Sequence, residues 1–200
     1  MKGSLIILSF FAAGLLVGVF KWVPVEWMQF DFSFYVLCTL MFSVGISIGN
    51  DPASFGQFRN IHPRFIFLPL MTVAGTFAGV TLVGLMLNKW SFSECLAVGS
   101  GFGYYSLSSI LITQYKGIEL GTIALLSNII REVITLLFAP LMVKYFGKLS
   151  PISAGGATTI DTTFPVIVKY SGKNYAIVSI YHGFIMDFSV PFLVTLFCSL

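Results

Sequence analysis

The sequence predicts an all-α polytopic membrane protein with about five full transmembrane helices and two interrupted, re-entrant elements. Hydrophobic residues make up 56% of the 200 residues, charged residues only 10%, and the mean hydropathy is +0.92. A soluble domain carries roughly a quarter charged residues, so this chain cannot cover a water-facing surface. Its apolar runs are too long and too uniform for the alternating strands of a membrane β-barrel, which leaves helices.

The charge and the cysteine content exclude other classes of protein. A net charge of +3 is typical of basic cytoplasmic loops rather than of a nucleic-acid-binding surface. The three cysteines show no metal-binding or redox spacing, so we interpret them as small apolar residues within the membrane. We therefore predict a single membrane-embedded domain over residues 1–200, without enzyme activity, cofactor or metal.

Five apolar stretches approach or exceed the length of about 20 residues that a membrane-spanning helix needs. They are Ser4–Phe20, Phe32–Gly49, Phe65–Leu87, Leu120–Val143 and Tyr175–Leu200. Lys2 precedes the first stretch, and no clear cleavage site follows it, so we expect it to be a retained span rather than a signal peptide. Pro69 predicts a kink near the start of the third span.

Two further segments are apolar but interrupted. Glu94–Gln114 contains GSGFGYYSLSS, and Ile152–Val168 contains GGATTIDTTFP. Glycine, serine and threonine in such numbers weaken a continuous helix. Irregular backbone at membrane depth is tolerated only where it is buried in protein or lines a wet cavity. Both segments are therefore predicted to be broken, re-entrant elements packed against other helices.

Basic residues indicate the orientation in the membrane. If neither interrupted segment crosses, seven basic residues share one side, namely Lys2, Arg59, Arg64, Lys144, Lys148, Lys169 and Lys173. Three others, Lys21, Lys89 and Lys116, lie on the opposite side. If the first segment or both segments cross, the split falls to six against four. The positive-inside rule favours the first arrangement, with the N-terminus in the cytoplasm and the C-terminus outside.

In that arrangement the two interrupted segments enter the membrane from opposite faces. This is the geometry of inverted-repeat transporters, in which substrate and coupling ions bind near the midplane at interrupted helices. The inverted repeat is an expectation from this pattern alone.

The fourth span carries a polar stripe at its centre, within SNIIREVIT. Arg131 and Glu132 each cost about 2.5–3.5 kcal/mol at mid-bilayer on the insertion scale, so they need partners. Asn128 and Thr135 lie three or four residues away, along the same face of the helix. We predict that Arg131, Glu132 and Asn128 belong to a binding site. The alternative for Arg131 is a structural clamp with a carboxylate.

The threonine-rich segment places a carboxylate, Asp161, in an unwound stretch. Glycines allow the backbone to unwind, and the hydroxyls of Thr158, Thr159 and Thr162 both donate and accept hydrogen bonds. Pro165 suits the first turn of a new helix. Such a pocket can bind an ammonium group or a proton, so we predict that Asp161 and these threonines form a binding site. The alternative is that Asp161 caps the helix that follows.

The other interrupted segment and the last span contribute further candidates. Ser100 and its neighbouring glycines offer backbone N–H and hydroxyl groups to a substrate, or else pack closely against a helix. Asp187 could coordinate a cation or pair with Arg131. His182 lies five residues before Asp187 and does not share its helical face; it could relay a proton or serve as a packing residue.

These motifs resemble those of the LysO-type lysine exporters. The resemblance is carried by GSGFGYYSLSS, by NIIREVITLLFAPLMVKYFGKLSPISAGGATTIDTTFPVIVKYSG and by HGFIMDFSVPF, and it covers the chain from about residue 31 onward. It implies export of L-lysine and its toxic analogues across the bacterial inner membrane, in exchange for protons. The buried acids of that family would correspond to Glu132 and Asp161. Full-length exporters carry further spans before this region, so the resemblance also implies a short membrane protein as partner that supplies them.

Two rival functions stay open on the sequence. A transporter or channel for another cationic or small amino acid would share every feature above and differ only in its substrate. An intramembrane serine hydrolase would use Ser100 with His182 as a dyad, but it would leave Glu132 and Asp161 without a role.

Overall fold

The computed structural model describes residues 63–87 and 89–200, together with residues 9, 13, 14, 16–20, 22, 39, 42 and 46. Within the two long ranges every regular element is a helix. The elements are α5 (Pro63–Ile66), α6 (Leu68–Met86), α7 (Phe92–Gly99), α8 (Tyr105–Lys116), α9 (Ile118–Phe146), α10 (Ser150–Gly155), η2 (Gly156–Ile160), α11 (Phe164–Ser171), η3 (Lys173–Tyr175) and α12 (Ala176–Ser199). The spans predicted over Ser4–Phe20 and Phe32–Gly49 lie, apart from a few single residues, outside the described residues.

Three helices in the described part of the chain are long and apolar enough to cross a membrane: Leu68–Met86, Ile118–Phe146 and Lys173–Ser199. They confirm the third, fourth and last predicted spans as helices of spanning length. Near Pro69 the third predicted span is interrupted at Phe67, between α5 and α6, and Pro69 itself lies in the first turn of α6. Proline fits there, since the first turn does not need its missing N–H.

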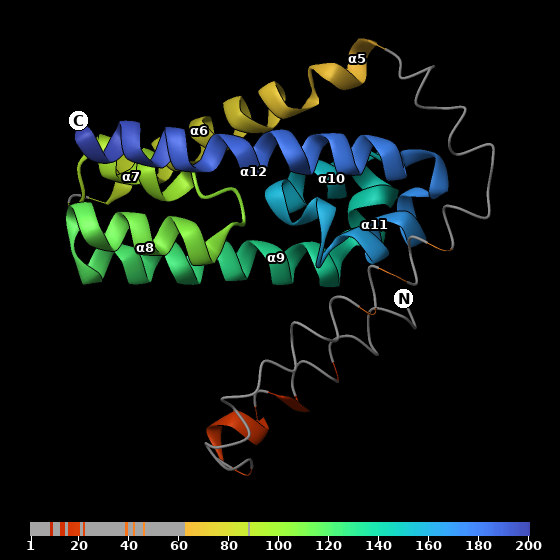
Figure 1. Ribbon diagram of the computed structural model, residues 1–200, viewed down its shortest axis with the longest axis horizontal. Helices are drawn as coiled ribbons and strands as arrows, with labels where there is room; N and C mark the ends of the chain where they lie inside the picture. Colours follow the sequence, from red (N-terminus) through yellow and green to blue (C-terminus); the bar gives the residue numbers. More distant parts are fainter. Residues whose placement is uncertain are drawn as a thin grey trace.

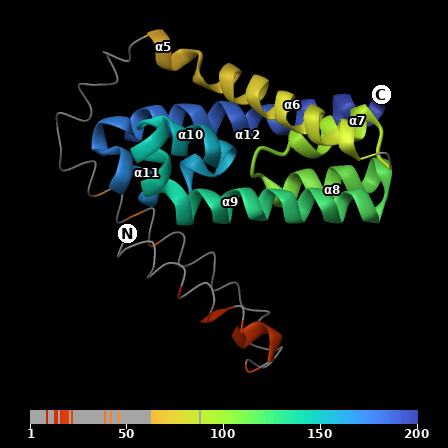
Figure 2. The same cartoon turned by 180° about the vertical axis from the view of Figure 1, so that it is seen from behind.

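Both interrupted segments fold as helical hairpins. The first hairpin, Phe92–Lys116, consists of α7, a break and α8; the second hairpin, Ser150–Ser171, consists of α10, η2 and α11. Figures 1 and 2 show α7 and α8 at one end of the molecule and α10 and α11 at the other, beside α9 and α12, which run past both. Each hairpin therefore enters and leaves at the same end, as predicted for re-entrant elements.

The tips of the two hairpins meet near the middle of the molecule. The amide of Ala157 donates a hydrogen bond of 2.9 Å to the carbonyl oxygen of Phe102. Beside this bond, Gly156 has a φ of +64°, and a Cβ atom at this residue would lie 2.1 Å from the Phe102 oxygen. Only glycine accommodates both the left-handed backbone and the close approach.

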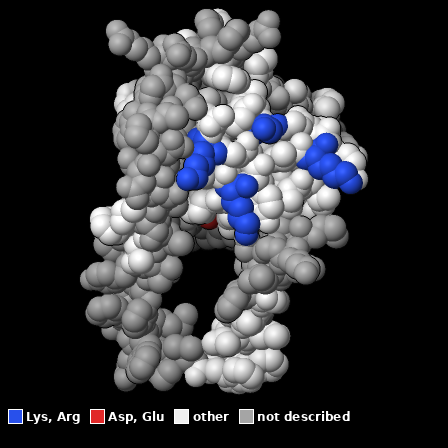
Figure 3. Space-filling view, turned by 90° about the vertical axis from the view of Figure 1, so that its right-hand side faces the viewer, with Lys and Arg blue, Asp and Glu red and all other residues white. Residues whose placement is uncertain are grey.

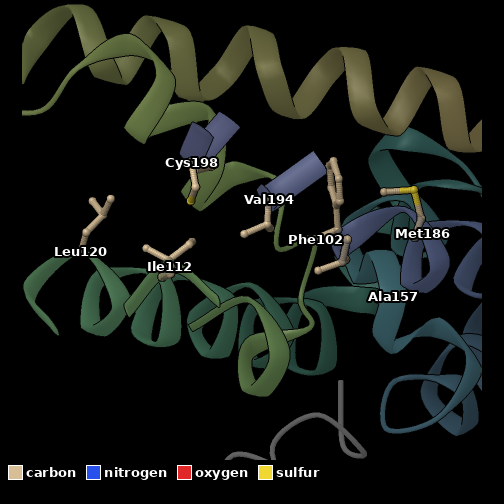
Figure 4. Packing of buried hydrophobic residues seen from close by; sticks show 10 residues of the cluster. Phe102, Ile112, Leu120, Ala157, Met186, Val194 and Cys198 are labelled. Carbon is tan, nitrogen blue, oxygen red and sulfur yellow. The ribbon is translucent and has the colours of Figure 1, made fainter. Parts of the chain in front are cut away.

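A buried apolar cluster holds the first hairpin against α9 and α12. It includes Phe102 at the hairpin tip and Ile112 on α8, with Leu120 on α9 and Met186 and Val194 on α12 (Figure 4). In lipid the surroundings are as apolar as these side chains, so close packing rather than exclusion of water stabilises such contacts.

Polar contacts hold the second hairpin against α12. The hydroxyl of Thr159 donates to the carbonyl of Ser179 at 3.0 Å, and the hydroxyl of Ser179 donates back to the carbonyl of Thr159 at 2.8 Å. One turn further on, a Cβ atom on Gly183 would lie 2.5 Å from both Thr159 and Ile160. The absence of a side chain at Gly183 therefore lets the tip of the hairpin touch the helix.

The end at which the second hairpin opens is basic. Lys144 lies in the last turn of α9, Lys148 between α9 and α10, Lys169 in the last turn of α11 and Lys173 in η3. Figure 3 looks onto this end and shows its basic side chains spread over one face. At the opposite end, by contrast, Glu119 forms an ion pair with Lys89.

Candidate functional site

A cavity of about 290 Å³ lies where the hairpin tips meet. The first hairpin contributes the residues 103–106, and the second hairpin contributes residues 157, 158 and 160–162. Glu132 of α9 and Asp187 of α12 complete the wall. The cavity is therefore built from both irregular tips and from both neighbouring spans, which is where irregular backbone is tolerated in a membrane protein.

Three half-buried carboxylates face this cavity. Asp161 accepts a hydrogen bond from the amide of Thr162 at 2.5 Å and one from its hydroxyl at 3.3 Å. The Thr162 side chain also interacts with Glu132. Asp161 lies close enough to Glu132 and to Asp187 for its charge to interact with both. Like charges this close repel one another in apolar surroundings, so bound cations or protons would stabilise the group.

The predicted threonines divide between two roles. Thr158 and Thr162 line the cavity. The hydroxyl of Thr158 donates to the carbonyl of Gly155 at 2.9 Å, which ties it to its own hairpin. Thr159 is fully buried and bonded to Ser179 on α12, away from the cavity wall. Threonine in this segment therefore serves both the cavity and the attachment of the hairpin.

Arg131 is turned away from the cavity and holds the second hairpin instead. Its Nε donates to the carbonyl of Ala154 at 2.7 Å, and one terminal nitrogen donates to the carbonyl of Ser153 at 3.0 Å. The other terminal nitrogen donates to the hydroxyl of Thr76 on α6 at 3.3 Å. The clamp expected as an alternative is thus present, but its partners are backbone carbonyls at the end of α10. The pairing of Arg131 with Asp187, considered from the sequence, is not formed.

Asn128 forms hydrogen bonds to the first hairpin and does not line the cavity. Its Oδ1 accepts a hydrogen bond from the amide of Gly103 at 2.7 Å. Its Nδ2 donates to the hydroxyl of Ser108 at 3.3 Å and to the carbonyl of Ala124 at 2.8 Å. Asn128 therefore fixes the backbone of a cavity residue from behind.

Ser100 and His182 belong to different contacts. Ser100 is fully buried and donates to the carbonyl of Leu96 at 2.7 Å, within its own helix. The Nε2 of His182 lies 2.9 Å from the hydroxyl of Thr72, which in turn lies 2.7 Å from the hydroxyl of Ser153. The hydrogen bond that a Ser100–His182 dyad would need is absent between these two described residues.

The cavity wall also includes three residues of the interrupted segment that was predicted to offer groups to a substrate, and one residue, Ile160, that was not a candidate. Tyr104, Tyr105 and Ser106 form the wall on the side of the first hairpin, and Ile160 forms part of the opposite side. A search for polar and charged groups misses Ile160, because its side chain is apolar. Within the described residues, no group of three or more His, Cys, Asp or Glu side chains is placed to hold a metal ion.

Re-entrant hairpins that meet at an acid-lined cavity between membrane-spanning helices define a polytopic helical membrane transport protein. Sequence comparison supplies the family. The pattern of the family described as lysine exporter LysO matches residues 8–198, and the chain belongs to this family.

Two relatives show how far the similarity extends. A protein of Haemophilus influenzae named putative lysine exporter is 30% identical over 195 residues, which are 96% of this chain and 97% of that protein. Lysine exporter LysO of Escherichia coli K12 is 31% identical over 163 residues, which are 82% of this chain. The matched region is 54% of the E. coli protein, so the chain spans about half of that relative. No solved structure matches the chain.

Proposed function

We propose that this chain exports L-lysine and its toxic analogues through the cavity between the hairpin tips, in exchange for protons. The observation that carries the proposal is the convergence of Glu132, Asp161 and Asp187 on one cavity in a member of the lysine exporter family. Lysine carries two ammonium groups, and carboxylates held in apolar surroundings bind such groups more strongly than water-exposed ones do.

Exchange requires that lysine and protons compete for the same acids. Asp161 is the best placed of the three, because it lies near both Glu132 and Asp187 and on the tip of a hairpin. When lysine leaves, protons take up the negative charge, and when lysine binds they are released. Thr158 and Thr162 supply hydroxyl groups that can bond either state of the site.

The substrate carboxylate has a weaker partner than the amino groups. Arg131 already donates to Ala154, Ser153 and Thr76, so it is not free to bind a carboxylate in the cavity. Helix α8 begins at Tyr105 on the cavity wall, and Tyr104 gives it no side-chain cap. The amide of Tyr105 already donates to the carbonyl of Gly103, so we assign the next N–H groups of α8, from Ser106 onward, to the substrate carboxylate.

Alternating access follows from the two hairpins. Because they enter from opposite ends, a movement of the first hairpin would open the cavity toward one end, and a movement of the second toward the other. Their contact through Phe102 and Ala157 lies between these two routes. This is the arrangement in which substrate binds at interrupted helices between inverted repeats.

We place the protein in the bacterial inner membrane, with the N-terminus in the cytoplasm and the C-terminus outside. Support comes from the basic end of the molecule, where Lys144, Lys148, Lys169 and Lys173 gather around the opening of the second hairpin. The positive-inside rule puts such an end in the cytoplasm. Helix α12 then runs outward.

We further propose that the chain works with a short membrane protein that supplies additional N-terminal spans. The support is the E. coli relative, of which only 54% is matched by this chain. The H. influenzae relative, matched over 97% of its length, indicates that proteins of this size recur.

Growth on lysine-containing dipeptides tests the export function. Cells that lack lysine export accumulate lysine from such peptides, and we expect this chain, expressed with its small partner, to restore growth and lysine efflux. Glu132→Gln and Asp161→Asn should abolish rescue, whereas Glu119→Gln, which changes an exposed acid far from the cavity, should retain it. Full efflux by both cavity variants would refute the assigned site.

Transport in membrane vesicles from these cells distinguishes lysine from the rival substrates. If the chain carries another cationic or small amino acid instead, efflux of ornithine or a neutral amino acid will exceed that of lysine under matched gradients. A flux of lysine that stops on collapse of the pH gradient supports proton exchange; a flux that does not respond to the gradient contradicts it.

A further inference from the structure

The two halves of the cavity wall are related by an internal repeat. Each hairpin is followed by a membrane-spanning segment, and a glycine with nearly the same backbone conformation joins them. Gly117 has φ 96° and ψ 169°, and Gly172 has φ 102° and ψ 155°. Since the hairpins enter from opposite ends, the two hairpin–span units are inverted relative to each other.

Counting from these glycines pairs the residues of the cavity wall. Glu132 lies 15 residues after Gly117, and Asp187 lies 15 residues after Gly172. Ser106 lies 11 residues before Gly117, and Asp161 lies 11 residues before Gly172. All four paired residues line the cavity, as do the pairs Gly103 with Thr158 and Tyr105 with Ile160. The cavity therefore has approximate two-fold symmetry, with one acid on each of the two spans.

All charged residues of the cavity wall carry the same sign. The described residues of the cavity wall include three carboxylates and no lysine, arginine or histidine. Arg131, next to Glu132 in sequence, has its donors on Ser153, Ala154 and Thr76. An anion bound among three acids without a cationic partner is strongly disfavoured. A zwitterionic ligand therefore binds here in spite of its carboxylate, not because of it.

We propose that the cavity also takes α,ω-diamines, unbranched chains with an ammonium group at each end. This inference rests on the proposed transport site. Glu132 and Asp187 hold one ammonium group each from the two spans, and Asp161 lies between them. A symmetric dication matches a two-fold site with equivalent acids, and it brings no carboxylate into the acidic cavity.

A matched series of competitors tests the inference. The full chain is reconstituted in proteoliposomes, with its partner where one is needed, and flux of labelled L-lysine is measured. The competitors are 1,5-diaminopentane, which is lysine without its carboxylate; 1-aminopentane, which has one ammonium group; and Nε-acetyl-L-lysine, whose side chain is neutral. Counterflow of labelled 1,5-diaminopentane is measured in parallel.

We expect 1,5-diaminopentane to reduce lysine flux at least about tenfold. At the same concentration the other two competitors should change the flux less than about twofold, because each of them lacks one ammonium group and a lost charge pair is worth at least a factor of about ten in affinity. Undiminished lysine flux in excess 1,5-diaminopentane overturns the inference and leaves lysine export standing. Diamine counterflow without lysine flux overturns lysine export and supports the diamine site. If neither compound is carried, both proposals fail.

The repeat supplies a variant that shifts selectivity. Ser106→Asp places a carboxylate at the position equivalent to Asp161, so both hairpin tips become acidic. We expect the ratio of diamine flux to lysine flux to rise about fivefold or more, because the added charge repels only the lysine carboxylate. Ser93→Asp, at the far end of α7 and off the cavity wall, is the matched control. An unchanged ratio counts against the proposal, and the competitor series on the unaltered chain decides it even if Ser106→Asp does not fold.

Discussion

The carbonyl oxygen of Phe102 accepts a hydrogen bond of 2.9 Å from the amide of Ala157, and this bond joins the tips of the two hairpins. Phe102 has a φ of +44°, a left-handed backbone conformation that a bulky residue rarely adopts. Strain of this kind persists only where the surrounding structure enforces it, and it is common at functional sites. Because both tips line the cavity, their contact fixes its shape.

The tip contact predicts that Gly156 cannot be replaced. In Gly156→Ala the new Cβ would lie 2.1 Å from the Phe102 oxygen, at a backbone φ of +64°. We expect a loss of about 1–3 kcal/mol in the free energy of unfolding and a loss of lysine transport, because the tips must separate. Thermal unfolding in detergent measures the first effect.

Gly79→Ala is the control for this change. A Cβ atom on Gly79, within α6, meets no atom within 4 Å. Because alanine favours a helix more than glycine does, the free energy of unfolding should stay the same or rise by about 0.5–1 kcal/mol. Equal unfolding temperatures for Gly156→Ala and Gly79→Ala would show that the two tips are not in close contact.

Arg131 is predicted to stabilise the fold rather than to bind the substrate. Arg131→Met leaves the carbonyls of Ser153 and Ala154 without their donors, and each buried unsatisfied group costs about 1–3 kcal/mol. Arg131→Lys retains a charge but not the geometry of three separate donors, so its loss of stability should be smaller. The free energy of unfolding and the KM for lysine are to be measured on both variants.

The split between these two quantities identifies the role of Arg131. For Arg131→Lys we expect a lower free energy of unfolding, and we expect the folded protein to have an unchanged KM for lysine. A KM raised tenfold at unchanged stability would instead assign the guanidinium to the substrate carboxylate. Lys144→Met, in the last turn of α9, controls for the loss of a positive charge.

Asn128 is predicted to be a positioning residue. Asn128→Ala leaves the amide of Gly103 without an acceptor, at a cost of about 1–3 kcal/mol. Asn128→Asp keeps that acceptor but loses the donors to Ser108 and Ala124 and adds a buried charge. Both variants should unfold at lower temperature, yet the ratio of lysine to ornithine flux should stay the same, because Asn128 is not on the cavity wall.

The control for Asn128 is Thr122→Ala, which removes a hydroxyl bonded within α9 to Ile118. It should leave stability within about 0.5 kcal/mol of the unaltered protein. A change of substrate ratio in Asn128→Asp would place this side chain in contact with the substrate and contradict a purely positioning role.

The interruptions in the helices could be predicted because they depend on local composition. Glycine, serine and threonine weaken a helix wherever they cluster, and an acid such as Asp161 in an apolar stretch has few places to lie other than a protected cavity. The same reasoning singled out Glu132. Both carboxylates do lie on one cavity wall, although their role in binding stays a prediction.

The direction of Arg131 and the correspondence of Ser106 with Asp161 could not be predicted in this way. Arg131 and Glu132 are adjacent on α9, so their side chains point about 100° apart, and the pattern alone does not tell which one faces the cavity. The partners of Arg131 are backbone carbonyls, which every residue has and no sequence motif marks. Ser106 is a common residue, and only its spacing from Gly117, which matches that of Asp161 from Gly172, distinguishes it.

The basic end of the molecule predicts the orientation of the described spans. In a variant without cysteines, a single cysteine replaces either Lys148, which lies between α9 and α10, or Lys116, which lies at the opposite end before Gly117. If the positive-inside rule holds, a membrane-impermeant thiol reagent added to intact cells labels the cysteine at residue 116, while the cysteine at residue 148 reacts only after the membrane is opened. The two substitutions remove one positive charge each, so they are matched in charge and differ only in position. Labelling of residue 148 from outside would invert the whole arrangement, and the second hairpin would then open to the exterior.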